Sequence, residues 1–112
     1  MSVEGAWKVE VMGPHGWERI ATALLKDGRY FGASADHYST GSYEFSDDSI
    51  TWDAHVNQYG KVRAVYGSKK RQINVRFEGR LKKEDKIVGR SRATDNNKFD
   101  LKTRLIRLGD ID

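Results

Sequence analysis

The stretch of sequence that decides the fold reads ITWDAHV and spans residues 50–56. Every second residue from Ile50 to Val56 is apolar, and the residues between them are polar. Successive side chains of a β-strand point to opposite faces, so a period of two is typical of a strand with one buried face. We therefore predict a strand over residues 50–57.

The same alternation recurs on both sides of this stretch. The pair Asp27-Gly28 is a strong signal for a tight β-hairpin, and it favours a strand over a helix for the residues just before it. Clusters of Gly, Pro, Asp and Ser at 13–16 and 46–49 also indicate turns, 35–40 and 57–68 are predicted as connections, and 94–97 as a turn. The remaining strands are predicted at 6–11, 17–26, 29–34, 41–46, 70–80, 86–93 and 99–106.

About eight strands at a spacing of roughly 8–12 residues predict an all-β sandwich or barrel. Short hairpin connections favour an up-and-down antiparallel barrel, which closes on itself and leaves no free edge. Its 112 residues make a single domain, 1–112. The inner face is predicted to include Trp7, Val9, Ile50, Trp52, Val56, Val75, Phe77, Ile87, Phe99 and Leu101.

The charge is divided unevenly along the chain. Residues 1–60 carry four basic and nine acidic side chains, whereas 61–92 carry twelve basic and three acidic ones. A molecule polarised in this way could bind an anion or nucleic acid, or pair its halves in a dimer. On the basic stretch, the one aromatic of the strand 70–80, Phe77, faces away from Arg76. Nucleic-acid binding is therefore disfavoured but stays open, because such surfaces usually interleave cations with exposed aromatics.

Little in the sequence indicates catalysis or a cofactor. The chain has no cysteine, and its histidines, His15, His37 and His55, lack the short spacing of metal-binding pairs. No nucleophile elbow or phosphate-binding loop occurs. No apolar run reaches the ~20 residues of a membrane span, and no signal pattern opens the chain. We expect a cytosolic, non-enzymatic protein with no metal and no cofactor.

Two apolar residues near the end of the chain, Ile106 and Leu108, fall on the parity that should face outward. Exposed apolar side chains indicate a contact surface. They could meet the first strand of the same barrel or a second subunit, and both readings stay open. We name them as candidate dimer contacts.

Three segments, residues 24–32, 36–44 and 50–52, resemble the GrlR family of negative regulators of type III secretion. The family pattern is an apolar-Lys-Asp-Gly hairpin, then Gly-x-x-x-Asp-x-x-Tyr-x-x-Gly-x-Tyr, after an opening strand with an aromatic residue. This chain follows it except that one residue, not two, separates Asp36 from Tyr38. Gly5-Ala6-Trp7 at the start and the Leu-rich segment 105–108 at the end extend the resemblance over nearly the whole chain.

The resemblance implies a small lipocalin-like barrel that forms a dimer, has no catalytic activity, and binds and restrains a transcriptional activator. In the family an acidic turn between the fourth and fifth strands looks like the partner contact. Here that turn contains Asp47 and Asp48, which we name as candidate partner-binding residues; two of four acidic positions remain, and serines flank them.

The opening of the chain also resembles avidins in outline, with Gly5-x-Trp7, then Asp27-Gly28 and Gly32. That resemblance implies the alternative function of a small-molecule-binding barrel of calycin type. Aromatic residues provide pocket walls. The candidate ligand-lining residues are Trp7, Tyr43, Trp52 and Phe77, which could equally fill the core.

Overall fold

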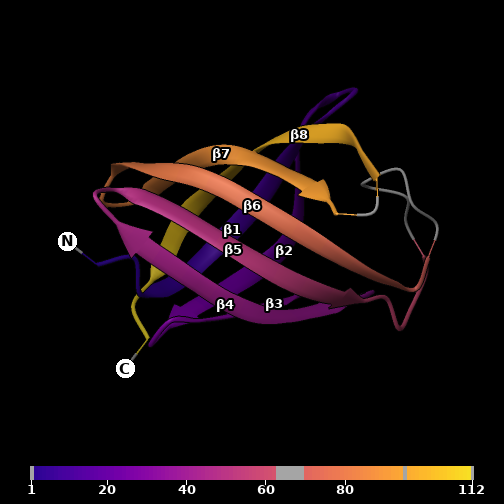
Figure 1. Cartoon of the computed structure of the whole chain (residues 1–112), viewed down its shortest axis with the longest axis horizontal. Coiled ribbons are helices and arrows are strands. Elements are labelled where there is room, and N and C mark those ends of the chain that lie inside the picture. The colour runs from indigo at the N-terminus through magenta and orange to yellow at the C-terminus, as the bar shows by residue number, and fades with distance from the viewer. Residues whose placement is uncertain (1, 63–69, 95, 112) are drawn as a thin grey trace.

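The protein is a closed antiparallel β-barrel of eight strands (Figure 1). The computed structural model describes residues 2–62, 70–94 and 96–111. Each strand pairs with the next in sequence, and the last pairs with the first. The strands are β1 (Gly5–Gly13), β2 (Gly16–Lys26), β3 (Arg29–Ala33), β4 (Tyr38–Ser46), β5 (Ser49–Asn57), β6 (Gln72–Lys83), β7 (Lys86–Ala93) and β8 (Asn96–Gly109). The predicted up-and-down barrel is confirmed.

The alternation of the sequence becomes the inside and outside of the barrel. On β5, Ile50, Trp52 and Ala54 are buried, whereas Asp53 and His55 are exposed. The predicted inner-face residues are buried, apart from the partly buried Val56 and Leu101, and the side chain of Phe99 lies outside the described residues. The core forms one large cluster around Trp7, Trp52 and Phe77 and a smaller one around Ile73, Val75 and Ala93.

Three strands differ from the prediction by three residues at one or both ends, and four others differ by one or two residues. β4 begins at Tyr38, inside the segment predicted as a polar connection, and β8 extends over 96–109, which includes part of a predicted turn. β6 starts at Gln72 and runs on to Lys83. Ser39 explains the first difference: it is buried, and its hydroxyl donates a hydrogen bond to the Tyr30 hydroxyl at 3.0 Å. A polar residue can face a barrel interior when the interior supplies its partner.

Two hairpin turns have the left-handed backbone that the strand twist requires. Asp27 and Gly28 have φ angles of 51° and 76°, and Asp47 and Asp48 have 53° and 64°. Two consecutive residues with positive φ define the turn type that matches the right-handed twist of paired strands. The second turn places Asp48, which has a Cβ, where the first has glycine.

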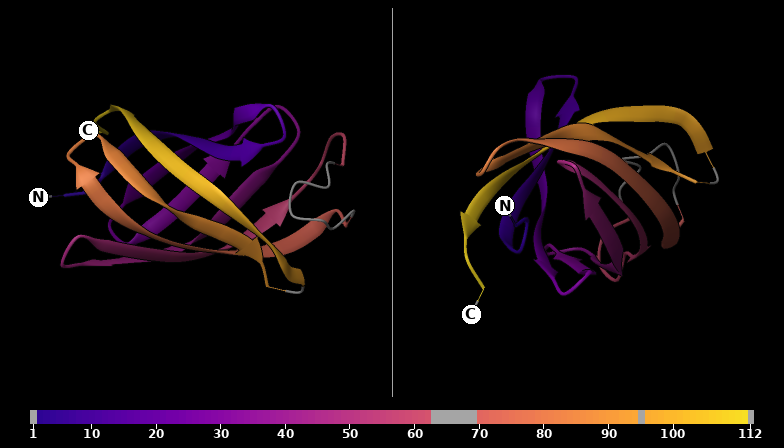
Figure 2. Two further views of the ribbon diagram at one scale, coloured as in Figure 1. Left: turned by 90° about the horizontal axis from the view of Figure 1, so that it is seen from above. Right: turned by 60° about the vertical axis from the view of Figure 1, so that its left-hand side comes forward.

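The two ends of the barrel differ. Both termini lie at one end, where Val3 and Trp7 are buried, and the end of β5 and the start of β6 lie at the other (Figures 1 and 2). No helix among the described residues is long and apolar enough to cross a membrane.

Candidate functional site

The end of the barrel that carries the termini is closed by packing. Trp7 has no exposed surface, and its Nε1 donates to the Val3 carbonyl at 2.9 Å. The guanidinium of Arg107 covers the Trp7 ring and donates to the carbonyls of Glu84, Glu4 and Ser2 at 2.8, 2.6 and 2.9 Å. Trp7, one of the four candidate ligand-lining residues, is thus sealed into the closed end.

Tyr43, the second candidate, packs half-buried against the same core. Desolvation raises the pKa of its hydroxyl, and a hydrogen bond that the tyrosine oxygen accepts from the backbone of Gly28 opposes that rise. Tyr43 does not border the cavity described next.

The other two candidates, Trp52 and Phe77, lie in the middle of the barrel beside a small cavity. Tyr30, Trp52 and Phe77 form a stacked series, with ring centroids 4.7 Å and 4.2 Å apart. A cavity of about 60 Å³, counted as space open to the centres of water molecules, adjoins these rings. On a measure of this kind about 10–15 Å³ is enough for one water, so the cavity has room for a few water molecules.

Polar groups line part of this cavity. Ser39 bonds Tyr30, and the Ser91 and Thr103 hydroxyls lie 2.6 Å apart. Burial raises the pKa of Tyr30, and the hydrogen bond from Ser39 lowers it by less. No buried side-chain nitrogen or oxygen of the described residues lacks a hydrogen-bond partner. The interior is therefore well satisfied as it stands.

On the outside of the barrel, a row of apolar side chains crosses four strands. Leu24 on β2 pairs directly with Phe31 on β3, and they are 39% and 43% exposed. Ala6 on β1 pairs with Leu24 on one side and with Gly109 of β8 on the other. Leu108, the residue before Gly109, is 55% exposed. We call Leu24, Phe31, Ala6 and Leu108 the apolar row.

The two candidate dimer contacts of the sequence have different surroundings. Leu108 belongs to the apolar row. Ile106 is half-buried and pairs with Lys8 on β1 and Lys86 on β7. Sequence reasoning missed Leu24 and Phe31, although their outward parity on two confirmed strands was available as a signal.

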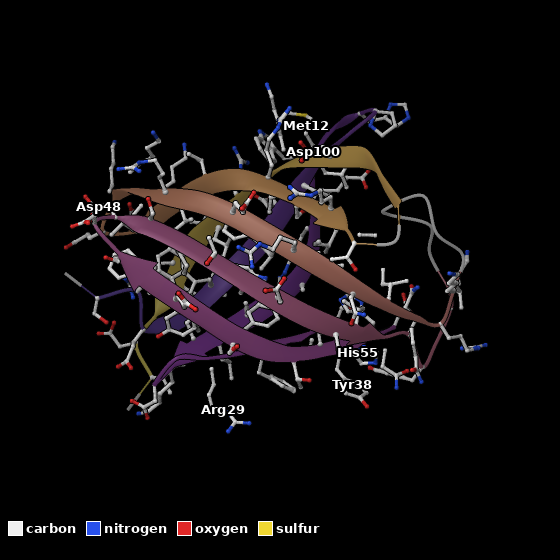
Figure 3. All side chains as sticks on the ribbon, in the orientation of Figure 1. Met12, Arg29, Tyr38, Asp48, His55 and Asp100 are labelled. Carbon is white, nitrogen blue, oxygen red and sulfur yellow. The ribbon has the colours of Figure 1, made fainter. Side chains whose placement is uncertain are left out.

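The acidic turn, Asp47 and Asp48, is exposed at the tip of the β4–β5 hairpin (Figure 3 labels Asp48). The backbone holds this turn: the Asp48 carbonyl accepts from the Leu81 amide at 2.8 Å, and Arg80 donates to the Asp47 carbonyl at 3.4 Å. Within the described residues, neither carboxylate takes part in an ion pair. Both charges face solvent.

The outer faces of β6, β7 and β8 are basic. Across β6 and β7, Arg76 pairs with Arg92 and Glu78 pairs with Arg90. Glu78 offsets the unfavourable arginine pair, because its carboxylate lies 3.7 Å from Arg76 and 3.4 Å from Arg92. Asp53 binds Arg76 at 2.6 Å, while His55 pairs with Asn74 at 2.9 Å and not with Asp53.

Sequence reasoning also missed an aromatic on this basic surface. Trp17, near the start of β2, stacks against the guanidinium of Arg104 on β8, 4.1 Å from its ring centroid. No group of three or more potential metal ligands occurs among the described residues.

No family model matches the chain, and no curated protein is similar enough in sequence to count as a relative. The residues themselves must carry any inference about function.

Proposed function

We propose that the protein is a non-catalytic, cytosolic interaction module that binds protein partners through the outside of its barrel. The resemblance to GrlR-type negative regulators of type III secretion suggests that one partner is a transcriptional activator, which the barrel would restrain. The observation that carries the proposal is the apolar row on the outer face.

The interior of the barrel is too small for a drug-sized ligand, which favours binding on the outer surface. Pockets for drug-sized ligands measure about 300–1,000 Å³, and the cavity here measures about 60 Å³. Leu24 and Phe31, by contrast, expose apolar surface side by side at no benefit to the barrel core. Contiguous exposed apolar side chains are typical of a contact surface.

We assign the apolar row to a second copy of the chain. Ala6 and the exposed Leu108 continue the Leu24–Phe31 pair across β1 to β8, so one patch can meet its own copy about a two-fold axis. The acidic turn remains outside this row and available to a basic partner. Paired charges at a loop tip steer an oppositely charged protein and set its orientation.

Sedimentation equilibrium at micromolar concentration tests self-association. The wild type should sediment as a dimer, and the double variant Leu24→Ser/Phe31→Ser as a 12.8 kDa monomer. The matched control is Met12→Ser, which removes another exposed apolar side chain outside the row. A monomeric wild type, or a double variant that still forms dimers, would refute the role of the row.

The acidic turn is tested separately in affinity captures from bacterial cytosol, quantified by mass spectrometry. Asp47→Asn/Asp48→Asn keeps the side-chain hydrogen bonding of the turn and removes both charges. A partner whose recovery at low salt falls with this variant and persists with Leu24→Ser/Phe31→Ser binds at the acidic turn. Equal recovery with all variants contradicts the contact.

A second candidate function, the binding of a very small polar molecule inside the barrel, is favoured by the hydroxyls of Tyr30, Ser39, Ser91 and Thr103 around the cavity. Native mass spectrometry of gently purified protein would detect a retained molecule. Ala54 also borders the cavity, so Ala54→Leu should abolish retention. Protein that carries no added mass counts against this candidate.

A further inference from the structure

A groove on the outside of the barrel brings an aromatic residue of β2 together with basic residues of β6, β7 and β8. The end of the β1–β2 hairpin, where Met12 pairs with Trp17, lies beside the outer face of β8 (Figures 1 and 3). Between Trp17 and the outer faces of β6, β7 and β8 is an open groove of about 640 Å³. It shares no residue with the apolar row or with the acidic turn, although Arg80 on its rim donates to the Asp47 carbonyl.

Bare backbone forms part of the groove. Gly79 on β6 and Gly89 on β7 pair directly, and both line it. A Cβ on Gly89 would collide with the Glu78 carbonyl oxygen, and one on Gly79 would collide with the buried Phe77 ring. Both glycines therefore face the core, as Phe77 and Ile87 do on the same strands, and it is their backbone that faces the groove.

The rim of the groove is cationic. Its charged residues are Glu78, Arg80, Lys82, Arg90 and Lys102. Glu78 is engaged by Arg76 and Arg92, and Arg90 is paired with Asp100 at 3.3 Å. Among the described residues, Arg80, Lys82 and Lys102 form no ion pair with a carboxylate. Three cations are thus left to attract an anionic ligand.

Trp17 supplies the aromatic wall. Arg104 holds its ring by stacking at 4.1 Å, and Arg104 is itself fixed by Glu10 at 2.7 Å. This chain of contacts orders the indole before any ligand arrives. An ordered aromatic loses little conformational freedom when a flat group stacks on it.

We propose that this groove binds single-stranded nucleic acid. Such strands are bound by cationic grooves that follow the phosphates and by aromatic side chains on which bases stack. Here Lys82 and Lys102 meet phosphates, Trp17 stacks with a base, and the outward backbone of the Gly79–Gly89 pair forms the floor between them. Double-stranded nucleic acid is a poorer fit, because its base faces are covered by neighbouring base pairs. An acidic peptide is a poorer fit because it offers no base to stack on the indole.

Fluorescence anisotropy of a labelled twelve-residue oligothymidylate at low salt tests the proposal. Stacking is worth about 1–3 kcal/mol per base, so Trp17→Ala should weaken binding about tenfold, and Trp17→Phe should weaken it less. Lys82→Gln/Lys102→Gln should reduce the dependence of log K on log salt by about 1.4, because each phosphate contact contributes about 0.7 for single strands. Lys26→Gln/Arg29→Gln removes the same charge at the β2–β3 hairpin, away from the groove, and should leave both quantities unchanged.

Four results would overturn the proposal. The first is undetectable binding of the oligonucleotide by wild-type protein, and the second is equal affinity of wild type and Trp17→Ala. The third is an equal loss with the control pair. The fourth is displacement by poly-glutamate that is as effective as displacement by unlabelled oligonucleotide, which would indicate a general polyanion or acidic-protein surface. Urea unfolding midpoints of each variant establish that the barrel is intact.

Discussion

The guanidinium of Arg107 lies 4.4 Å from the centroid of the Trp7 ring. From there it donates to the carbonyls of Ser2, Glu4 and Glu84, and so joins the segment before β1 to the β6–β7 turn. One side chain of the last strand thereby closes the end of the barrel. The cation is attracted to the face of the indole and is shielded from water by the elements it connects.

Replacement of Arg107 by Met should lower the free energy of unfolding by about 2–3 kcal/mol, because three carbonyls lose a charged donor. Arg107→Lys should cost less than Arg107→Met, because lysine keeps the positive charge. It should still destabilise the barrel, because an ammonium cannot donate to three carbonyls as the planar guanidinium does. Urea unfolding followed by tryptophan fluorescence measures both. Equal stability of the Met variant and wild type would show that the contacts of Arg107 with Trp7 and the three carbonyls do not stabilise the barrel.

Truncation of Phe77 to Ala should cost about 3–5 kcal/mol, because it removes a fully buried ring from the stack on Trp52. Phe31→Ala serves as the matched control, since Phe31 is half exposed on the outer face, and it should cost far less. Urea unfolding at a concentration where both variants are monomeric makes the comparison. A similar cost for the two would contradict the assignment of inner and outer faces.

The β4–β5 turn should be stabilised by Asp48→Gly, by roughly 0.5–1 kcal/mol. Asp48 has a φ of 64°, which glycine adopts without the steric penalty of a Cβ. Asp48→Ala should destabilise the barrel, because alanine has neither the freedom of glycine nor the local hydrogen bonding of aspartate. Thermal unfolding of the two variants beside wild type measures the effect, and a gain with Ala would contradict it.

Above about pH 10 the barrel should lose stability through Tyr30. Burial raises the pKa of Tyr30 in the folded state, so its contribution is complete below the unfolded pKa near 10 and disappears as the pH rises from there toward the folded value. Unfolded protein releases the proton first, which favours unfolding. Urea midpoints between pH 8 and 11 should fall more steeply for wild type than for Tyr30→Phe, and parallel curves would contradict the burial.

The alternation from Ile50 to Val56 predicted the barrel well because one face of each strand enters the core and the other faces water. Ser39 shows where that reasoning fails. The start of β4 is polar on both faces, and its inward hydroxyl is satisfied by Tyr30 from another strand. Because Tyr30 lies nine residues away on another strand, the alternation of polar and apolar residues within β4 gives no sign of this hydrogen bond.

The candidate sites were less predictable than the fold, because they depend on which strands become neighbours. The prediction that Phe77 and Arg76 lie on opposite faces of one strand is confirmed, because it depends on that strand alone. Trp17 reaches the basic surface only because the β1–β2 hairpin lies against β8 and Arg104 stacks on its ring. Leu24 and Leu108 come to lie on either side of β1 only when β8 closes on β1.

That closure has a consequence for how the chain is made. Arg104 and Glu10, which join β8 to β1, are separated by 94 positions. On the ribosome, β1 must therefore wait for nearly the whole barrel to be synthesised before its partner emerges. Until then, β1 and the newest strand each present unpaired backbone groups, which invite pairing with another nascent chain. Polysomes that place several such chains close together are thus the setting in which this protein is most exposed to misassembly, and a chaperone that covers β1 would be of most use there.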